Sequence, residues 1–199
     1  MAFVPAPGEQ FTIRRKVLKL FGAAFHIYDA NNNVVGYCKQ KAFKLKEDIR
    51  IFTDESMSTE LIRIAARSII DFGATYDIIN PDGSVAGSMR RKGMASTFIR
   101  DEWLLFDAKG QQVGTVTEDG SFMAFLRRYV EYVNLFSPQS FTLKRTNGTV
   151  AANFRQHFNL FVYRLGVKMS DDFDPNEPLD EMVVLAAACV LAAVEGRQG

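Results

Sequence analysis

The chain has 199 residues, of which 47% are hydrophobic and 24% charged, as expected of one ordinary globular domain or two small ones. Its formal net charge of +1 excludes the strong overall basic excess that is typical of nucleic-acid-binding proteins. Two cysteines, Cys38 and Cys189, are too few for a disulfide scaffold or a cysteine-rich zinc site.

Residues 1–10 are predicted to be an N-terminal tail that precedes a single domain over residues 11–199. The stretch MAFVPAPGEQ lacks the basic segment followed by an apolar segment that a signal peptide requires. Its second residue is Ala2, where N-myristoylation requires glycine. We therefore expect a cytoplasmic protein with reduced thiols.

Four stretches share one pattern: an aromatic residue that begins a strand, a polar turn, and a second strand that begins near a valine. They are FHIYDANNNVVGY (25–37), YDIINPDGSVAGS (76–88), WLLFDAKGQQVGT (103–115) and FTLKRTNGTVAAN (141–153). Apolar residues tend to alternate with others before each turn, as in a half-buried strand, and the turns contain residues that favour tight reversals. A less regular copy lies at 49–66. Most residues from Phe11 to Met169 are therefore predicted to form consecutive antiparallel hairpins.

Two segments favour helix instead. In SFMAFLRRYVEYVNLF (121–136) apolar residues recur at helical spacing after a capping Ser121, which predicts an amphipathic helix on the surface. After an acidic linker over 170–178, a second helix is predicted over 179–195. Its uninterrupted apolar run, Met182–Val194, would span roughly 20 Å as a helix, against about 30 Å of bilayer hydrocarbon. We therefore expect no transmembrane span and a helix buried inside protein.

These elements predict a mainly β fold. A long antiparallel meander leaves two exposed edges unless it closes on itself. A closed antiparallel barrel, with the alanine-rich C-terminal helix buried along its axis and one helix on its surface, accounts for every predicted element.

The stretch FTIRRKVLKLFGAAFHIYDANNNVVGYCKQKAFKLKEDIRIF (11–52) resembles the opening of LURP-one-related proteins, relatives of the phospholipid scramblases and of the tubby C-terminal domain. The segments RKVLKL and KQKAFKLKEDIRIF, the repeated Asp/Asn-x-x-Gly turns and the apolar C-terminal helix carry the resemblance, which covers roughly residues 10–196. It implies a tubby-like barrel of twelve strands around a central C-terminal helix. Because tubby-type domains bind phosphoinositides, it also implies an anionic lipid as a partner.

Basic residues cluster in three places, and two of the clusters are candidate lipid-binding sites. The candidates are Lys39, Lys41, Lys44 and Lys46 in the first cluster, and Arg90, Arg91 and Lys92 in the second. The third cluster comprises Arg14, Arg15, Lys16 and Lys19. Such a patch attracts anionic head groups, at about 1 kcal/mol for each charge near the surface. The alternative is that these are ordinary solvent-facing residues of barrel strands.

The acidic linker offers one candidate metal site, at Asp172 and Asp174. Their spacing resembles the start of a calcium loop, and scramblases carry a calcium-binding segment at this place. However, Glu177 stands where such a loop needs glycine, and Val183 where it needs a bidentate glutamate. We favour a solvated linker whose acids suit the positive N-terminal end of the following helix.

No sequence motif predicts catalysis. His26 and His157 lack a neighbouring cysteine, and neither HExxH nor G-x-S-x-G occurs. We therefore expect a monomeric, non-catalytic module without a cofactor, which binds anionic phospholipid head groups peripherally at a membrane and has no nucleic-acid partner. Two alternatives remain: scramblase-like transfer of lipids between leaflets, and a protein-interaction scaffold with no lipid role.

Overall fold

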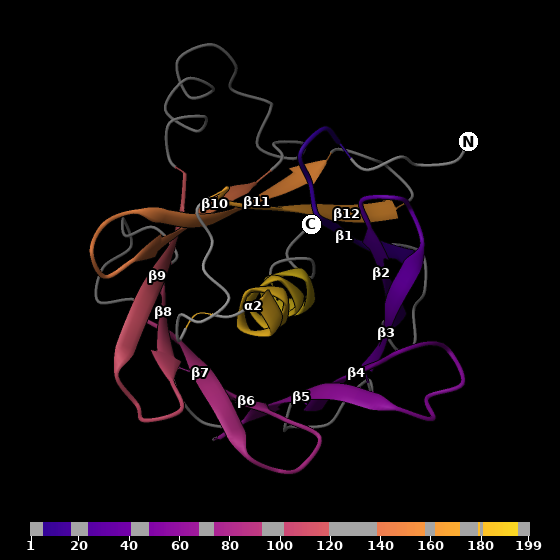
Figure 1. Cartoon of the computed structure of the whole chain (residues 1–199), viewed down its shortest axis with the longest axis horizontal. Helices are drawn as coiled ribbons and strands as arrows, with labels where there is room; N and C mark the ends of the chain where they lie inside the picture. The colour runs from indigo at the N-terminus through magenta and orange to yellow at the C-terminus, as the bar shows by residue number, and fades with distance from the viewer. Residues whose placement is uncertain are drawn as a thin grey trace, which may run out of the picture.

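Twelve antiparallel strands form a closed barrel in the computed structural model of this chain (Figure 1). The structure describes residues 6–16, 24–40, 48–67, 74–92, 102–119, 139–157, 162–171, 179 and 181–194. For Lys16, Lys39, Gln40 and Val194 it describes the backbone only. The predicted surface helix at 121–136 lies outside the described residues and stays a prediction.

Strands that are consecutive in the sequence pair with one another, and the first strand closes the barrel against the last. The strands are β1 (Phe11–Lys16), β2 (Ala24–Asp29), β3 (Val34–Gln40), β4 (Asp48–Phe52), β5 (Glu60–Ala66), β6 (Thr75–Ile79), β7 (Val85–Arg91), β8 (Glu102–Asp107), β9 (Gln112–Glu118), β10 (Ser140–Arg145), β11 (Val150–His157) and β12 (Val162–Met169). Closure gives both β1 and β12 a second partner, so neither presents the unpaired edge of an open meander. The predicted barrel of about twelve strands is confirmed.

The same irregularity recurs in all five tight hairpins. In each one the register shifts by one residue at the second position of the second strand, which leaves that residue as a β-bulge. The bulged residues are Val35, Leu61, Ala86, Val113 and Ala151. A bulge bends its strand and increases the local right-handed twist. Five bulges at equivalent positions therefore help the sheet to curl until its edges meet.

The core lies between the strands and the helix α2 (Glu181–Val194), which runs inside the ring of strands (Figure 1). From Val183 to Ala193 no side chain of α2 is more than 5% exposed. Alternate strand residues complete the core with large apolar side chains such as those of Ile13, Ile64 and Leu105, each fully buried. The predicted buried helix is confirmed, with bounds close to the expected 179–195.

The two ends of the barrel differ in their connections. One end, which we call the turn end, carries the tight turns at 30–33, 53–59, 80–84, 108–111 and 146–149. Each turn is closed by a side-chain oxygen that accepts a backbone N–H hydrogen bond. The acceptors are Asp29, Asp54, Asp82, Asp107 and Asn147, at distances of 2.7 to 2.9 Å. Because neighbouring strands are antiparallel, all odd-numbered strands finish at the opposite end.

Candidate functional site

The predicted lysine cluster begins where β3 ends. Lys39 is paired in register with Arg50 of β4, and Arg50 in turn with Arg63 of β5. The Arg50 guanidinium also forms ion pairs with Asp48, at 3.1 Å, and Glu60, at 3.4 Å, so its charge is partly offset. The other three lysines of the cluster, Lys41, Lys44 and Lys46, lie outside the described residues.

The second predicted cluster is divided by the alternation of β7. Arg90 is exposed, and its guanidinium lies 5.1 Å from the centroid of the Phe106 ring. Arg91 points the other way, towards the core, where its guanidinium lies 5.6 Å from the centroid of the fully buried Trp103 ring. Lys92 forms an ion pair with Glu102 at 3.0 Å. These three cations are therefore neighbours in sequence but not one continuous patch.

The described members of both clusters nevertheless share one end of the barrel with those of the third. Strands β1, β3 and β7 finish at the end opposite the turns, and their last residues include Arg15, Lys39 and Arg91. We call this the basic end. At this end the Arg15 guanidinium lies 5.5 Å from the centroid of the Tyr163 ring. Half-way round the barrel, the Arg91 guanidinium lies over the Trp103 ring in the same way.

The turn end is richer in acids. Hydrogen bonds from neighbouring turn residues hold the pKa values of Asp29, Asp54 and Asp82 below their ordinary value, so these carboxyls are ionised at neutral pH. The exposed Glu55 and the Asp107 carboxyl add to this end. Among the described residues, acids therefore predominate at the turn end, beside Lys109 and Lys144, whereas at the other end Asp48 and Glu102 offset part of the basic charge.

A further basic group lies on the outer surface where β1 meets β12. In register, four side chains from four neighbouring strands form what we call the seam row. Its members are His26 of β2, Arg14 of β1, Arg164 of β12 and His157 of β11. The Arg14 guanidinium donates a hydrogen bond to Asn32 at 2.7 Å and lies 4.0 Å from the centroid of the Tyr28 ring. Sequence reasoning placed Arg14 in a basic cluster and considered His157 only as a candidate catalytic residue. It did not bring either together with Arg164, because only barrel closure makes them neighbours.

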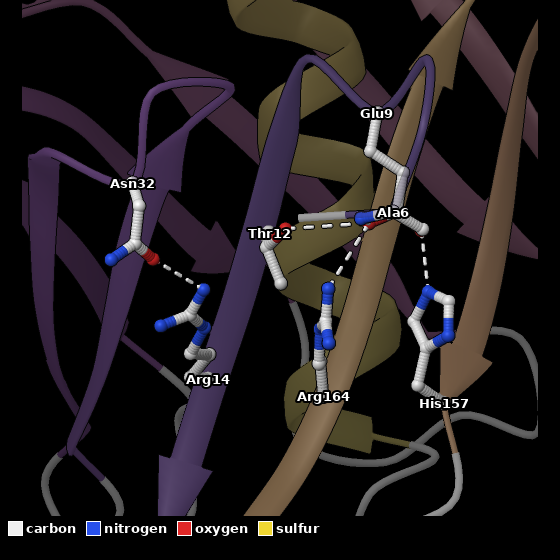
Figure 2. A network of polar contacts seen from close by, with 7 residues as sticks. All are labelled: Ala6, Glu9, Thr12, Arg14, Asn32, His157 and Arg164. Carbon is white, nitrogen blue, oxygen red and sulfur yellow. Dashed lines mark hydrogen bonds and ion pairs between the residues drawn. The ribbon is translucent and has the colours of Figure 1, made fainter. Parts of the chain in front are cut away.

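The Glu9 carboxylate lies over this seam, between β1 and β12 (Figure 2). Its Oε1 contacts Nε2 of His157, and its Oε2 lies 3.6 Å from Nη2 of Arg164. The Thr12 hydroxyl and the Ala6 backbone N–H also donate to Oε2, at 3.4 and 3.0 Å. The side chain is only 7% exposed. A buried carboxylate surrounded by donors in this way is fully satisfied, so it anchors residues 6–10 to the barrel.

A glycine makes room for this carboxylate. An added Cβ at Gly166 of β12 would lie 1.8 Å from Oε1 of Glu9, much closer than any two such atoms approach. We expect Gly166→Ala to displace the carboxylate and lower the free energy of unfolding by about 1–3 kcal/mol, because charged hydrogen bonds are lost. Thermal and chemical denaturation measure this directly.

The matched control for this prediction is the same change in a Glu9→Ala background. With the carboxylate already absent, Gly166→Ala should cost clearly less, so the two changes should not be additive. An equal cost in both backgrounds would show that Glu9 and Gly166 do not interact.

Comparison with known families decides what kind of barrel this is. A sequence model described as LURP-one-related matches residues 34–192, well over half of the chain. The chain belongs to the LURP-one-related family. The resemblance of residues 11–52 to these proteins predicted this, and the closed barrel around its helix agrees with it. A comparison with curated proteins gave no match.

The described residues of this LURP-one-related barrel give little indication of metal or thiol chemistry. Among them, no three His, Cys, Asp or Glu side chains are grouped so as to hold a metal ion. The calcium candidates Asp172 and Asp174 lie outside the described residues and stay a prediction. Burial raises the pKa values of both thiols, Cys38 and Cys189, which favours the protonated, unreactive form. Within the described part of the chain, no helix has both the length and the apolarity that crossing a membrane requires.

Proposed function

We propose that this LURP-one-related protein is a non-catalytic tubby-like module that binds anionic phospholipid head groups, phosphoinositides among them, through its basic end. The charge difference between the two ends is the observation that supports this most directly. Arg15, Lys39 and Arg91 stand at the ends of strands that finish on one side, whereas Asp54 and Asp82 lie in turns on the other. In this proposal the protein is a cytoplasmic monomer that associates peripherally with membranes.

Physical arguments favour an oriented, reversible contact. Each lysine or arginine near an anionic membrane contributes about 1 kcal/mol of attraction, which decays within a Debye length of about 8 Å at physiological ionic strength. The acids at the turn end are repelled by the same surface. The barrel would therefore approach with its basic end first, without inserting a helix into the bilayer.

Charge reversal at the basic end tests this proposal. We expect Lys39→Glu/Lys41→Glu to reduce binding to vesicles of phosphatidylcholine and phosphatidylserine by more than about tenfold, because two attractive charges become repulsive. Binding of the wild-type chain should also fall steeply as salt is added. Flotation of protein with vesicles, with and without a phosphoinositide, measures both effects.

The control is a double variant at the other end of the barrel. Lys109 lies in the exposed turn between β8 and β9, and Lys144 is exposed near the end of β10. Lys109→Glu/Lys144→Glu changes the net charge by the same amount but should leave flotation nearly unchanged. If both double variants lose flotation equally, binding depends on the net charge of the protein and not on the basic end. Binding that resists both salt and charge reversal would place the contact elsewhere.

The two alternative functions give different results in the same assay. A protein-interaction scaffold with no lipid role should not float with any anionic vesicle. A scramblase-like protein should move labelled lipid between the leaflets of reconstituted vesicles, which a peripheral head-group binder does not do. Absence of flotation would therefore contradict the proposed function and favour a scaffold.

A further inference from the structure

The outer surface of the barrel contains a small site that is filled by the protein itself. We call it the Gly166 notch. Its floor is Gly166 of β12, and its sides are formed by Thr12, His157 and Arg164 on β1, β11 and β12. The Glu9 carboxylate occupies it (Figure 2). The space that the carboxylate fills exists because Gly166 has no side chain: a Cβ at this position would occupy it.

The donors around the notch are those that bind oxyanions. A guanidinium and a hydroxyl of the barrel converge on one carboxylate oxygen, together with the Ala6 N–H of the occupant's own segment, and an imidazole of the barrel contacts the other oxygen. Carboxylates and phosphates are bound in proteins by this combination of charged and neutral donors. Further cations lie close in register: Arg155 is paired with Gly166, and Arg14 with Arg164. One carboxylate therefore sits among several positive charges.

The site and its occupant are held very differently. Thr12, His157 and Arg164 belong to three paired strands, so their positions are fixed by the barrel. Glu9 belongs to the short segment before β1, which folds back through a hydrogen bond from the Glu9 N–H to the Ala6 carbonyl at 3.0 Å. The next residue, Gln10, is bonded to β12 through its own backbone N–H. Departure of residues 6–9, which would take the Ala6 N–H with it, therefore does not require β1 to unpair.

We propose that the Gly166 notch is an oxyanion-binding site, for a carboxylate or a phosphate monoester, in which Glu9 is a built-in competing ligand. An external anion then binds only as residues 6–9 leave, so its apparent affinity is reduced by the fraction of time that Glu9 occupies the site. This goes beyond the proposed function, because the notch lies on the side of the barrel and uses none of the residues tested in the flotation experiment.

Chemical rescue tests the proposal. Glu9→Ala empties the notch and should lower the melting temperature relative to wild type. Sodium acetate or sodium phosphate, but not sodium chloride of equal ionic strength, should restore part of that loss, with a shift that grows with anion concentration. Because phosphate also stabilises folded proteins in general, the quantity compared is the shift of the variant minus that of the wild type.

Three further variants make the outcome specific. Glu9→Ala/Gly166→Ala places a methyl group in the notch and should lose the rescue. Glu55→Ala removes a carboxylate from His26, which it contacts at 2.6 Å on the exposed surface, and should show no rescue. Glu9→Gln keeps the shape of the occupant but weakens its hold, so it should respond at higher anion concentrations than Glu9→Ala. It also serves if Glu9→Ala does not fold.

Two results would overturn the proposal: equal shifts in acetate, phosphate and chloride, or a rescue that survives Gly166→Ala. The source of the anion is identified separately, with vesicles that contain phosphatidic acid. Added to the Lys39→Glu/Lys41→Glu background, Glu9→Ala should raise flotation if a lipid phosphate enters the notch. Rescue by soluble anions without a rise in flotation assigns the site to free carboxylates or phosphates. In either case the outcome does not alter the interpretation of the charge-reversal test, which concerns the basic end and not the notch.

Discussion

Replacing Ala187 with arginine is expected to abolish cooperative folding of the barrel. Ala187 lies in the middle of α2 and is 0% exposed, with the buried faces of the strands on all sides. An unpaired guanidinium there costs several kcal/mol, against a total stability of about 5–15 kcal/mol for a domain. We expect the variant to aggregate or to melt without a cooperative transition in calorimetry, and deletion of residues 180–199 to have the same effect.

The same substitution on the surface is the control. Ala108 is exposed in the turn between β8 and β9, so Ala108→Arg should melt within a few degrees of wild type. If Ala187→Arg melts like Ala108→Arg, the middle of α2 is not enclosed by the barrel. A truncated chain that folds and is merely released from membranes would instead identify the apolar run as an anchor.

Local patterns were sufficient to predict the barrel because they repeat. Each hairpin carries its own turn residues and its own alternation of apolar side chains, so errors in one copy do not affect the others. The apolar run from Met182 to Val194 then required a partner on every face, which a closed sheet supplies. The bulges at Val35 and at the four equivalent positions were not predicted. They depend on how the paired strands twist against each other, which a single strand's pattern does not reveal.

The seam of the barrel could not be predicted in the same way. Arg14 and Arg164 lie near opposite ends of the chain, and they become neighbours only because β1 pairs with β12. Glu9 stood in a segment that the sequence indicated to be a tail, yet it is buried under charged contacts. The one available signal was a carboxylate in a short segment otherwise free of charge, close before a strand rich in arginine and lysine.

The basic end and the proposed oxyanion notch depend on different features of the fold. The basic end depends on strand direction and on the cations that end the odd-numbered strands, since any barrel of alternating strands gathers those ends on one side. The notch depends on one closed seam, one glycine and one carboxylate. A change that opens the seam should therefore remove the notch first and leave much of the charge difference between the ends intact.

Gly87→Ala should destabilise the barrel by about 1–3 kcal/mol, because the added Cβ meets backbone and not a side chain. Gly87 follows the bulge at Ala86 in β7, and an ideal Cβ there would lie 2.6 Å from the carbonyl oxygen of Phe106 on β8. Relief requires β7 and β8 to move apart, which strains the hydrogen bonds between them. The free energy of unfolding from chemical denaturation measures the loss.

Gly36→Ala is the matched control, since Gly36 follows the bulge at Val35 in the equivalent hairpin position. Its added Cβ would lie 2.9 Å from Cδ1 of Ile27, the far end of a flexible side chain, and 3.3 Å from its Cβ, a contact that a small shift relieves. Ile27 can change its rotamer where a backbone carbonyl cannot move alone, and alanine also lowers the entropy of the unfolded chain, by about 0.4–1 kcal/mol. Gly36→Ala should therefore cost clearly less than Gly87→Ala. Equal costs, or the reverse order, would mean that backbone contact between the strands does not limit the size of the residue after the bulge.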